Sequence, residues 1–206
     1  MSIIKKIVET IKDDVEALQG NQTKDKRYQS EATYPDETTA RQAFTQAREK
    51  LLAVNSWSNL PGISATFTVY DQRGNRIDNN DSLVVGHFIL IELPGPLPHN
   101  WVRVVAITND DTAAEFTVVP SESPQHHEES TAPIEHFFTD EASSTFRVER
   151  QGTRLIACEI GQNERVNNAE ETAGKRSVVN TLLAAGGWAM FQETQWKKLT
   201  DYLVEP

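Results

Sequence analysis

The feature that most constrains the fold is a central block of strand-like segments with helical periodicity on either side of it. Between residues 61 and 160, apolar and polar residues alternate in short runs separated by turn sequences such as Arg73-Gly74-Asn75 and Gln151-Gly152. A period of two is typical of β-strands, and short turns join strands that run antiparallel. About six such strands, with helices only at the ends, indicate an α+β fold with an antiparallel sheet instead of βαβ units.

Two of the strand segments, residues 84–93 and 101–107, are apolar on both faces. Strands of this kind are usually covered on both sides, so we expect both to lie near the centre of the sheet. The connection between them, residues 94–100, contains three prolines and therefore cannot be helical. The alternation leaves open whether the sheet curls toward a small barrel.

A pair of helices is predicted in the N-terminal region, residues 1–60. In the first helix, up to Gly20, apolar residues recur at helical spacing between charged ones. The second helix begins after Asp36, a favourable N-cap. Its predicted buried stripe consists of Ala40, Ala43, Phe44, Ala47, Leu51 and Val54. The polar segment between the two helices, residues 21–34, has no period and is predicted to be a loop.

A second pair of helices is predicted in the C-terminal region, residues 161–206. The first of the two carries the apolar residues Val178, Val179, Leu182 and Leu183. Gly186-Gly187 interrupts the helical pattern. The apolar face of the last helix consists of Phe191, Trp196, Leu199 and Leu203.

Length and charge favour a single domain, residues 1–206, whose strand-rich core covers residues 61–119 and 143–160. A chain of 206 residues can bury an adequate core, and its one cysteine excludes a disulfide-framed scaffold. The formal net charge is −10, and residues 120–142 contain six acidic and no basic residues. This stretch, rich in Pro, Glu and His, is predicted to be a solvated loop that would favour a cationic surface.

Composition also restricts the partners and the location. An acidic chain with a pI near 5.0 lacks the basic surface that nucleic acids require. The longest apolar run, residues 88–91, is far shorter than the roughly 20 residues of a membrane-spanning helix. The first helix has no basic face for anionic lipid, and the N-terminus lacks the apolar core of a signal peptide. We therefore expect a cytoplasmic protein without nucleic-acid or membrane partners.

The sequence contains no motif that indicates a metal site, a cofactor or a catalytic residue. His126, His127 and His136 are not spaced to converge on one face of a helix or strand. The oxygen-rich segment 71–81 is more typical of a turn than of a calcium loop. Cys158 lies in a strand, where cysteine behaves as a small buried apolar residue. The phosphate-binding glycine loops and the G-x-S-x-G elbow are absent.

One group of polar residues is a candidate for ligand binding. Asn163 and Arg165 follow the end of a strand that looks buried, and His136 precedes two phenylalanines. Polar loops at strand ends often carry binding residues on a rigid scaffold, so these three residues form the predicted ligand site. The alternative is structural: Asn163 makes a turn, Arg165 pairs with a carboxylate, and His136 borders the core.

Three functions remain open at this point, and the third is metal-dependent hydrolysis through the loop histidines His126, His127 and His136. The first is a non-catalytic binding or assembly module, because the amphipathic N-terminal helix needs something to cover its apolar stripe. That cover would come from self-association or from a protein partner. The alternative is a small-ligand-binding protein, or an enzyme, with a pocket at the sheet edge. The first function predicts association through residues 1–20, whereas the second predicts an enclosed apolar cavity.

Overall fold

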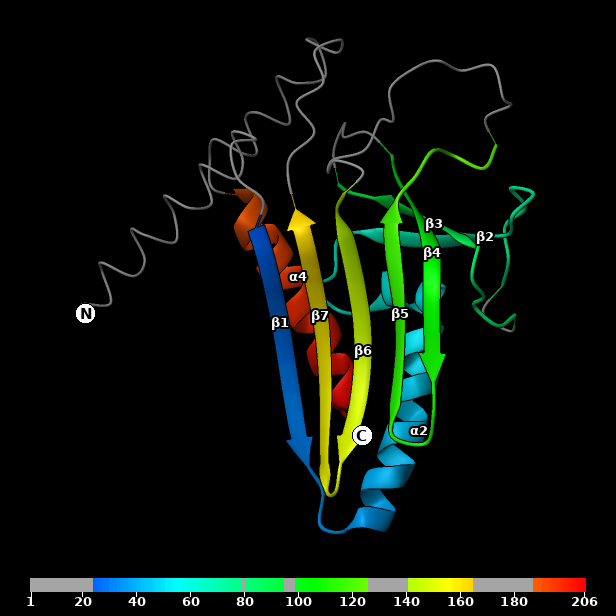
Figure 1. Ribbon diagram of the computed structural model, residues 1–206. Helices are drawn as coiled ribbons and strands as arrows, with labels where there is room; N and C mark the ends of the chain where they lie inside the picture. Colours follow the sequence, from blue (N-terminus) through cyan, green and yellow to red (C-terminus); the bar gives the residue numbers. More distant parts are fainter. Residues whose placement is uncertain (1–23, 79–80, 95–98, 126–140, 165–186) are drawn as a thin grey trace.

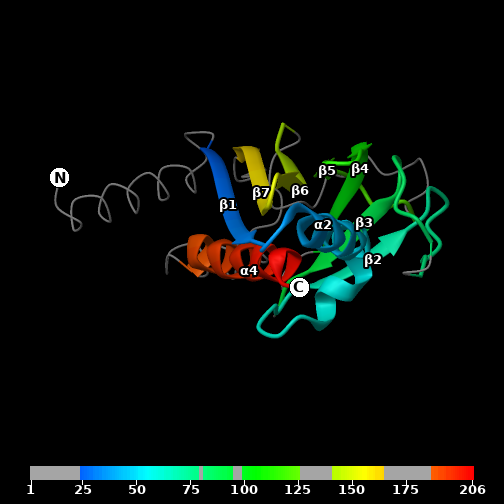
Figure 2. The ribbon, with the colours of Figure 1, turned by 90° about the horizontal axis from the view of Figure 1, so that it is seen from below.

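The computed structural model describes residues 24–78, 81–94, 99–125, 141–164 and 187–206, and it has an α+β fold. An antiparallel sheet forms one layer, and the helices lie together on one of its faces (Figures 1 and 2). The strands are β1 (Lys24–Thr33), β2 (Thr66–Tyr70), β3 (Phe88–Glu92), β4 (Asn100–Asn109), β5 (Ala113–Pro120), β6 (Ser143–Gln151) and β7 (Arg154–Glu164). The helices are α2 (Glu37–Leu52), the 3-10 helix η1 (Val54–Asn59) and α4 (Gly187–Val204).

The sheet has seven strands in the order β1-β7-β6-β5-β4-β3-β2, and every neighbouring pair is antiparallel. The predicted α+β class with an antiparallel sheet is therefore confirmed. The small barrel is not supported, because β1 and β2 form the two edges and do not pair with each other. Helices cover one face of the sheet, so its apolar side chains are buried without closure of the sheet into a barrel.

The prediction of a loop over residues 21–34 is wrong, because β1 occupies most of that segment and pairs with β7 along its length. Ser30 is buried, and its hydroxyl group forms a hydrogen bond of 2.7 Å with that of Thr200 in α4. Its neighbours Gln29 and Glu31 are exposed. The strand does alternate, but small and polar residues fill its inward positions, so hydropathy does not reveal the period.

The prediction that two doubly apolar strands lie near the centre of the sheet holds for β4, which is next to the middle strand, but not for β3. β5 is the middle strand, and β3 is next to the β2 edge. In β4, Val104 is 1% exposed and faces the core, whereas Val105 is 37% exposed on the other face. The helices cover only one face, and Val105 on the outer face stays in contact with solvent, although Leu90 and Trp101 on that outer face are buried.

One helix of each predicted pair is among the described residues. α2 begins as expected: the Asp36 carboxylate accepts a hydrogen bond of 2.8 Å from the backbone N–H of Thr39. α4 begins at Gly187, and its residues Leu199 and Leu203 are buried, as the periodicity predicts. The other two predicted helices, at residues 1–20 and 178–183, lie outside the described residues. Helix pairs are therefore not supported by the structure.

The core is centred on Trp57 of η1, which is 1% exposed. Its ring centroid lies 5.5 Å from that of Phe67, 6.0 Å from that of Phe116 and 5.2 Å from that of Phe146. The indole N–H donates a hydrogen bond of 3.0 Å to the backbone carbonyl of Lys50. Aromatic side chains bury large areas and favour edge-on and offset contacts, so Trp57 joins η1 to three strands.

We expect Leu199→Ala to lower the free energy of unfolding by about 2–5 kcal/mol, because it leaves a cavity between α4 and the sheet. Leu199 is 0% exposed. Urea denaturation followed by circular dichroism measures the change. Val84→Ala is the control, since Val84 is 44% exposed and its truncation should matter little. Equal losses in the two variants would show that α4 does not pack on the core as described.

Candidate functional site

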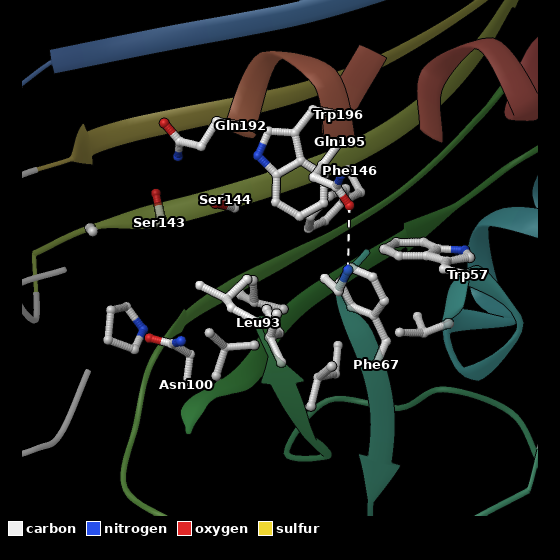
Figure 3. Close-up of a pocket in the computed structure, with 18 of the residues that line it drawn as sticks. Trp57, Phe67, Leu93, Asn100, Ser143, Ser144, Phe146, Gln192, Gln195 and Trp196 are labelled. Carbon is white, nitrogen blue, oxygen red and sulfur yellow. Dashed lines mark hydrogen bonds between the residues drawn. The ribbon is translucent and has the colours of Figure 1, made fainter. Parts of the chain in front are cut away.

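A pocket lies between α4, η1 and the helix-covered face of the sheet (Figure 3). Its cavity volume is about 90 Å³. The lining residues are Val54, Trp57, Ala65, Phe67, Ile89, Ile91, Leu93, Asn100, Val102, Val118, Pro120, Ala142, Ser143, Ser144, Phe146, Glu164, Gln192, Gln195 and Trp196. They come from six of the seven strands and from two helices, so the tertiary structure is required to form the pocket.

The pocket has an aromatic end, where the rings of Trp57, Phe67, Phe146 and Trp196 gather (Figure 3). The Trp196 ring of α4 lies 5.3 Å from the Phe146 ring and 6.3 Å from the Phe67 ring, measured between centroids. These contacts place Trp196 between the helix and two strands. The aromatic end therefore offers flat apolar surfaces suited to a ring or a hydrocarbon chain.

The opposite end of the pocket is polar, and Asn100, Ser143, Ser144 and Gln192 lie there (Figure 3). Glu164, which is 5% exposed, also lines the pocket and accepts hydrogen bonds of 3.3 and 3.4 Å from the Gln192 side-chain amide. We refer to these five residues as the polar end. An apolar pocket with a few buried polar groups can both enclose a ligand and orient it.

Lys26 of β1 holds part of the polar end in place. Its ammonium group donates a hydrogen bond of 2.6 Å to the Gln192 side-chain oxygen and lies 3.8 Å from a carboxylate oxygen of Glu164. Lys26 is not among the lining residues that the structure describes. Lys26 therefore orients the Gln192 side chain and partly balances the negative charge of Glu164, although it is not one of the described lining residues itself.

Glu159 of β7 is the most deeply buried acidic side chain among the described residues, at 1% exposure. In the strand register it lies opposite Phe146 on one side and Tyr28 on the other. Burial raises the pKa of Glu159 well above the ordinary value of 4.5, and the nearby Glu164 carboxylate raises it further. The Ser144 hydroxyl group favours the ionised form, but neither carboxyl oxygen has a partner at hydrogen-bonding geometry.

Gln195 has a structural role at the pocket wall. Its side-chain oxygen accepts hydrogen bonds from the backbone N–H group of Ser64, at 2.9 Å, and from that of Ala65, at 3.5 Å. Figure 3 shows the Gln195 side chain at the wall of the pocket. Its amide donates to the carbonyl of Gly62 at 3.4 Å. These bonds join α4 to the segment before β2, and the one from Ala65 gives the backbone N–H of a buried residue a partner.

The predicted site residues are not brought together among the described residues. Asn163 is exposed, has a positive φ of 53°, and its backbone N–H donates to the Asp25 carboxylate at 3.0 Å. It is not among the described residues that line the pocket. His136 and Arg165 lie outside the described residues, so their part in a ligand site stays a prediction.

Sequence reasoning did not include Glu164 or Gln192 among the three predicted site residues, although both left a signal. Gln192, Gln195, Trp196 and Leu199 follow helical spacing, so two glutamines occupy the buried face of an amphipathic helix. Glu159 similarly takes an inward position in a strand whose other inward residues are apolar. A polar residue at a position where the helix or strand period predicts a buried side chain is therefore a candidate for a ligand-binding site.

Other chemistry is limited in the described part of the chain. None of its His, Cys, Asp and Glu side chains form a group of three suited to a metal ion. The Asp71 carboxylate instead accepts hydrogen bonds from the backbone N–H groups of Arg73 and Asn75 in its own turn. Cys158 is 2% exposed, and burial raises the pKa of its thiol.

The described helices include none long and apolar enough to cross a membrane.

Comparison with known proteins gives a relationship of fold alone. No family model matches the chain, and none of the curated proteins matches it significantly. A hypothetical protein from Helicobacter pylori has the same fold, with 15% identity over 91% of this chain and 92% of that chain and a TM-score of 0.51.

Two plant proteins are more distant. A norcoclaurine synthase from Thalictrum flavum has 12% identity over 90% of each chain and a TM-score of 0.41. A major latex-like protein from Panax ginseng has 11% identity over 88% of this chain and 99% of that chain and a TM-score of 0.44. At this level of similarity neither protein bears on the function of the chain.

We expect Glu159→Gln to stabilise the protein increasingly as pH rises. Above pH 4.5 the unfolded chain ionises Glu159, whereas burial keeps the folded form protonated, so the wild-type free energy of unfolding falls as pH rises toward the folded-state pKa. Glutamine does not titrate. Thermal unfolding from acidic to mildly alkaline pH measures the difference between the two proteins.

The control for this experiment is Glu37→Gln on the exposed surface of α2, where the side chain is 63% exposed. It should show no difference from the wild type that grows with pH. A stability difference between Glu159→Gln and the wild type that does not shift in favour of the variant as pH rises would contradict the expectation, because the wild type would then not lose stability through Glu159.

Proposed function

We propose that this protein binds a small, largely apolar molecule in the pocket between α4 and the sheet. The observation that carries the proposal is the set of four aromatic rings that line a pocket of about 90 Å³. A ligand with an apolar body would pack against these rings.

The side chains that line the pocket favour binding over catalysis. The lining residues that the structure describes include no histidine, cysteine or lysine, and no histidine beside Ser143 or Ser144 that could activate a serine as a nucleophile. Glu164 is the one ionisable group among these described lining residues. The pocket is therefore better suited to recognition of a molecule than to its conversion, in line with the ligand-binding alternative from the sequence.

We expect Val118→Phe to weaken binding of phenylpropanol, a neutral probe with a terminal ring, by about tenfold or more. Val118 is 3% exposed and lines the pocket, so a phenyl ring placed there occupies the ligand volume. Isothermal titration calorimetry measures the affinity, and the tryptophan emission, to which Trp57 and Trp196 in the pocket contribute together with Trp101 and Trp188, gives a second signal of binding.

The matched control is Thr117→Phe, one residue earlier in β5. The Thr117 side chain bonds to that of Thr145 on the other face of the sheet, so its replacement leaves the pocket open. Thermal unfolding verifies that both variants are folded. Equal binding by wild type and the Val118→Phe variant, or no binding by the wild type, would count against the pocket as the binding site.

Assembly through the N-terminal helix also remains a proposal, as does the cytoplasmic location. Deletion of residues 1–20, which lie outside the described residues, should change the oligomeric or partner-bound state while the sheet stays folded. Size-exclusion chromatography with light scattering measures this change. The same monomer before and after the deletion would remove the support for self-association.

A further inference from the structure

We infer that a second copy of this chain pairs with β1, so that the two sheets join into one antiparallel sheet with a two-fold axis at Gln29. The inference goes beyond the proposed function, since none of the described lining residues of the pocket comes from β1. It depends on the backbone groups that the outer edge of β1 presents and on the charges that lie along this edge.

β1 is a long and regular edge strand. It pairs with β7 on one side and has no strand on its other side among the described residues (Figure 1). Its register with β7 is continuous from Lys26 to Thr33, and the strand contains no proline. An edge pairs readily with another strand unless a short length, a proline or a bulge prevents it. This stretch of β1 has none of the three and can accept another strand.

The opposite edge of the sheet, β2, is closed by side chains. The backbone N–H of Val69 donates a hydrogen bond of 2.8 Å to the side-chain oxygen of Asn55. The backbone N–H of Phe67 donates one of the same length to the hydroxyl group of Ser58. Both acceptors belong to η1, which therefore takes the place that a further strand would have beside β2. The described part of the chain protects one edge in this way and not the other.

Alternate residues of β1 direct their backbone groups away from β7. Directly after the strand, the N–H of Tyr34 donates a hydrogen bond of 2.9 Å to the carbonyl of Thr153. In an antiparallel pair every second residue bonds to the same neighbour, so Tyr34 and the even-numbered residues before it face β7. The N–H and C=O groups of Arg27, Gln29 and Glu31 therefore face the open edge. All three residues are exposed.

The charges along this edge select one register. When two β1 strands pair through these outward groups, the two-fold axis can pass through Arg27, Gln29 or Glu31. An axis at Arg27 places two arginines opposite each other, and an axis at Glu31 places two glutamates opposite each other. An axis at Gln29 places Arg27 opposite Glu31 of the second copy, and the contact occurs twice. Opposite charges across a strand pair stabilise it and like charges destabilise it, so we infer the axis at Gln29.

The contacts that these side chains already make are compatible with the pairing. Glu31 forms an ion pair with Arg154 of β7, and Arg27 donates a hydrogen bond of 3.1 Å to the Gln29 side-chain oxygen. Both contacts are exposed, and exposed contacts of this kind contribute little to stability. The inference does not require Glu31 to lack a partner. The backbone hydrogen bonds join the two strands, and the charges only decide between registers.

The test measures the oligomeric state of the full chain by size-exclusion chromatography with light scattering and by sedimentation, from micromolar to millimolar concentration. We expect a dimer whose fraction rises with concentration. Gln29→Pro removes the N–H at the axis and is tolerated at an edge position that faces away from β7. We expect it to weaken the dimer by about tenfold or more. Gln29→Ala keeps the N–H and is the matched control, which should dimerise as the wild type does.

A pair of charge variants tests the register itself. Arg27→Glu alone brings like charges together at both contacts of the dimer, and so does Glu31→Arg alone. We expect each to weaken the dimer by about tenfold. An equal mixture of the two variants restores opposite charges at both contacts, so we expect it to form a mixed dimer. Thermal unfolding verifies that every variant is folded.

Each outcome supports or overturns the inference. A wild type that stays monomeric at millimolar concentration overturns it and leaves the proposed ligand binding unaffected. A dimer that persists in Gln29→Pro, or in each charge variant alone, overturns it as well, because the interface then lies elsewhere. Loss of such a dimer on deletion of residues 1–20 would assign the interface to that segment. If the mixed charge variants do not associate, the axis at Gln29 is wrong. The charge variants decide the matter even if Gln29→Pro does not fold.

Discussion

The packing of α4 against one face of the sheet is the interaction on which the rest of the structure depends. Near the C-terminal end of α4, Leu199 and Leu203 are buried, and Thr200 bonds to Ser30 of β1. The hydroxyl group of Tyr34 donates a hydrogen bond of 2.8 Å to the carbonyl of Val204. These contacts join the last helix to the first strand, so residues far apart in the sequence close the core together.

The other part of α4 is packed differently, and this difference creates the pocket. Gln192 and Gln195 occupy inward positions where leucines would fill the space, and Trp196 contacts two strands across the cavity. Buried amides and carboxylates need hydrogen-bond partners, and Gln192 and Gln195 find theirs in Glu164, Lys26 and the segment before β2. This part of the core is therefore a pocket with a polar end and an aromatic end.

The sequence predicted the elements that follow a hydropathy period. Asp36 as the cap of α2 and the buried residues of α2 and α4 agree with the structure. The prediction was wrong for β1, where the inward positions are not occupied by apolar residues. Ser30, for example, is buried but is small and polar. The ligand site was sought in the exposed loop around Asn163, while its neighbour Glu164 lines the pocket. Local composition does not reveal which of two adjacent side chains faces inward.

The sequence by itself determined the α+β class and the antiparallel pairing, because alternation, turn residues and helix caps act over a few residues. Only the tertiary structure decided the strand order, the open sheet and the pocket, because these depend on which apolar faces meet across the molecule. The arrangement of charged and amide groups at the polar end also depends on the tertiary structure. Glu164, Gln192 and Lys26 act together only because α4 crosses the sheet beside β1 and β7.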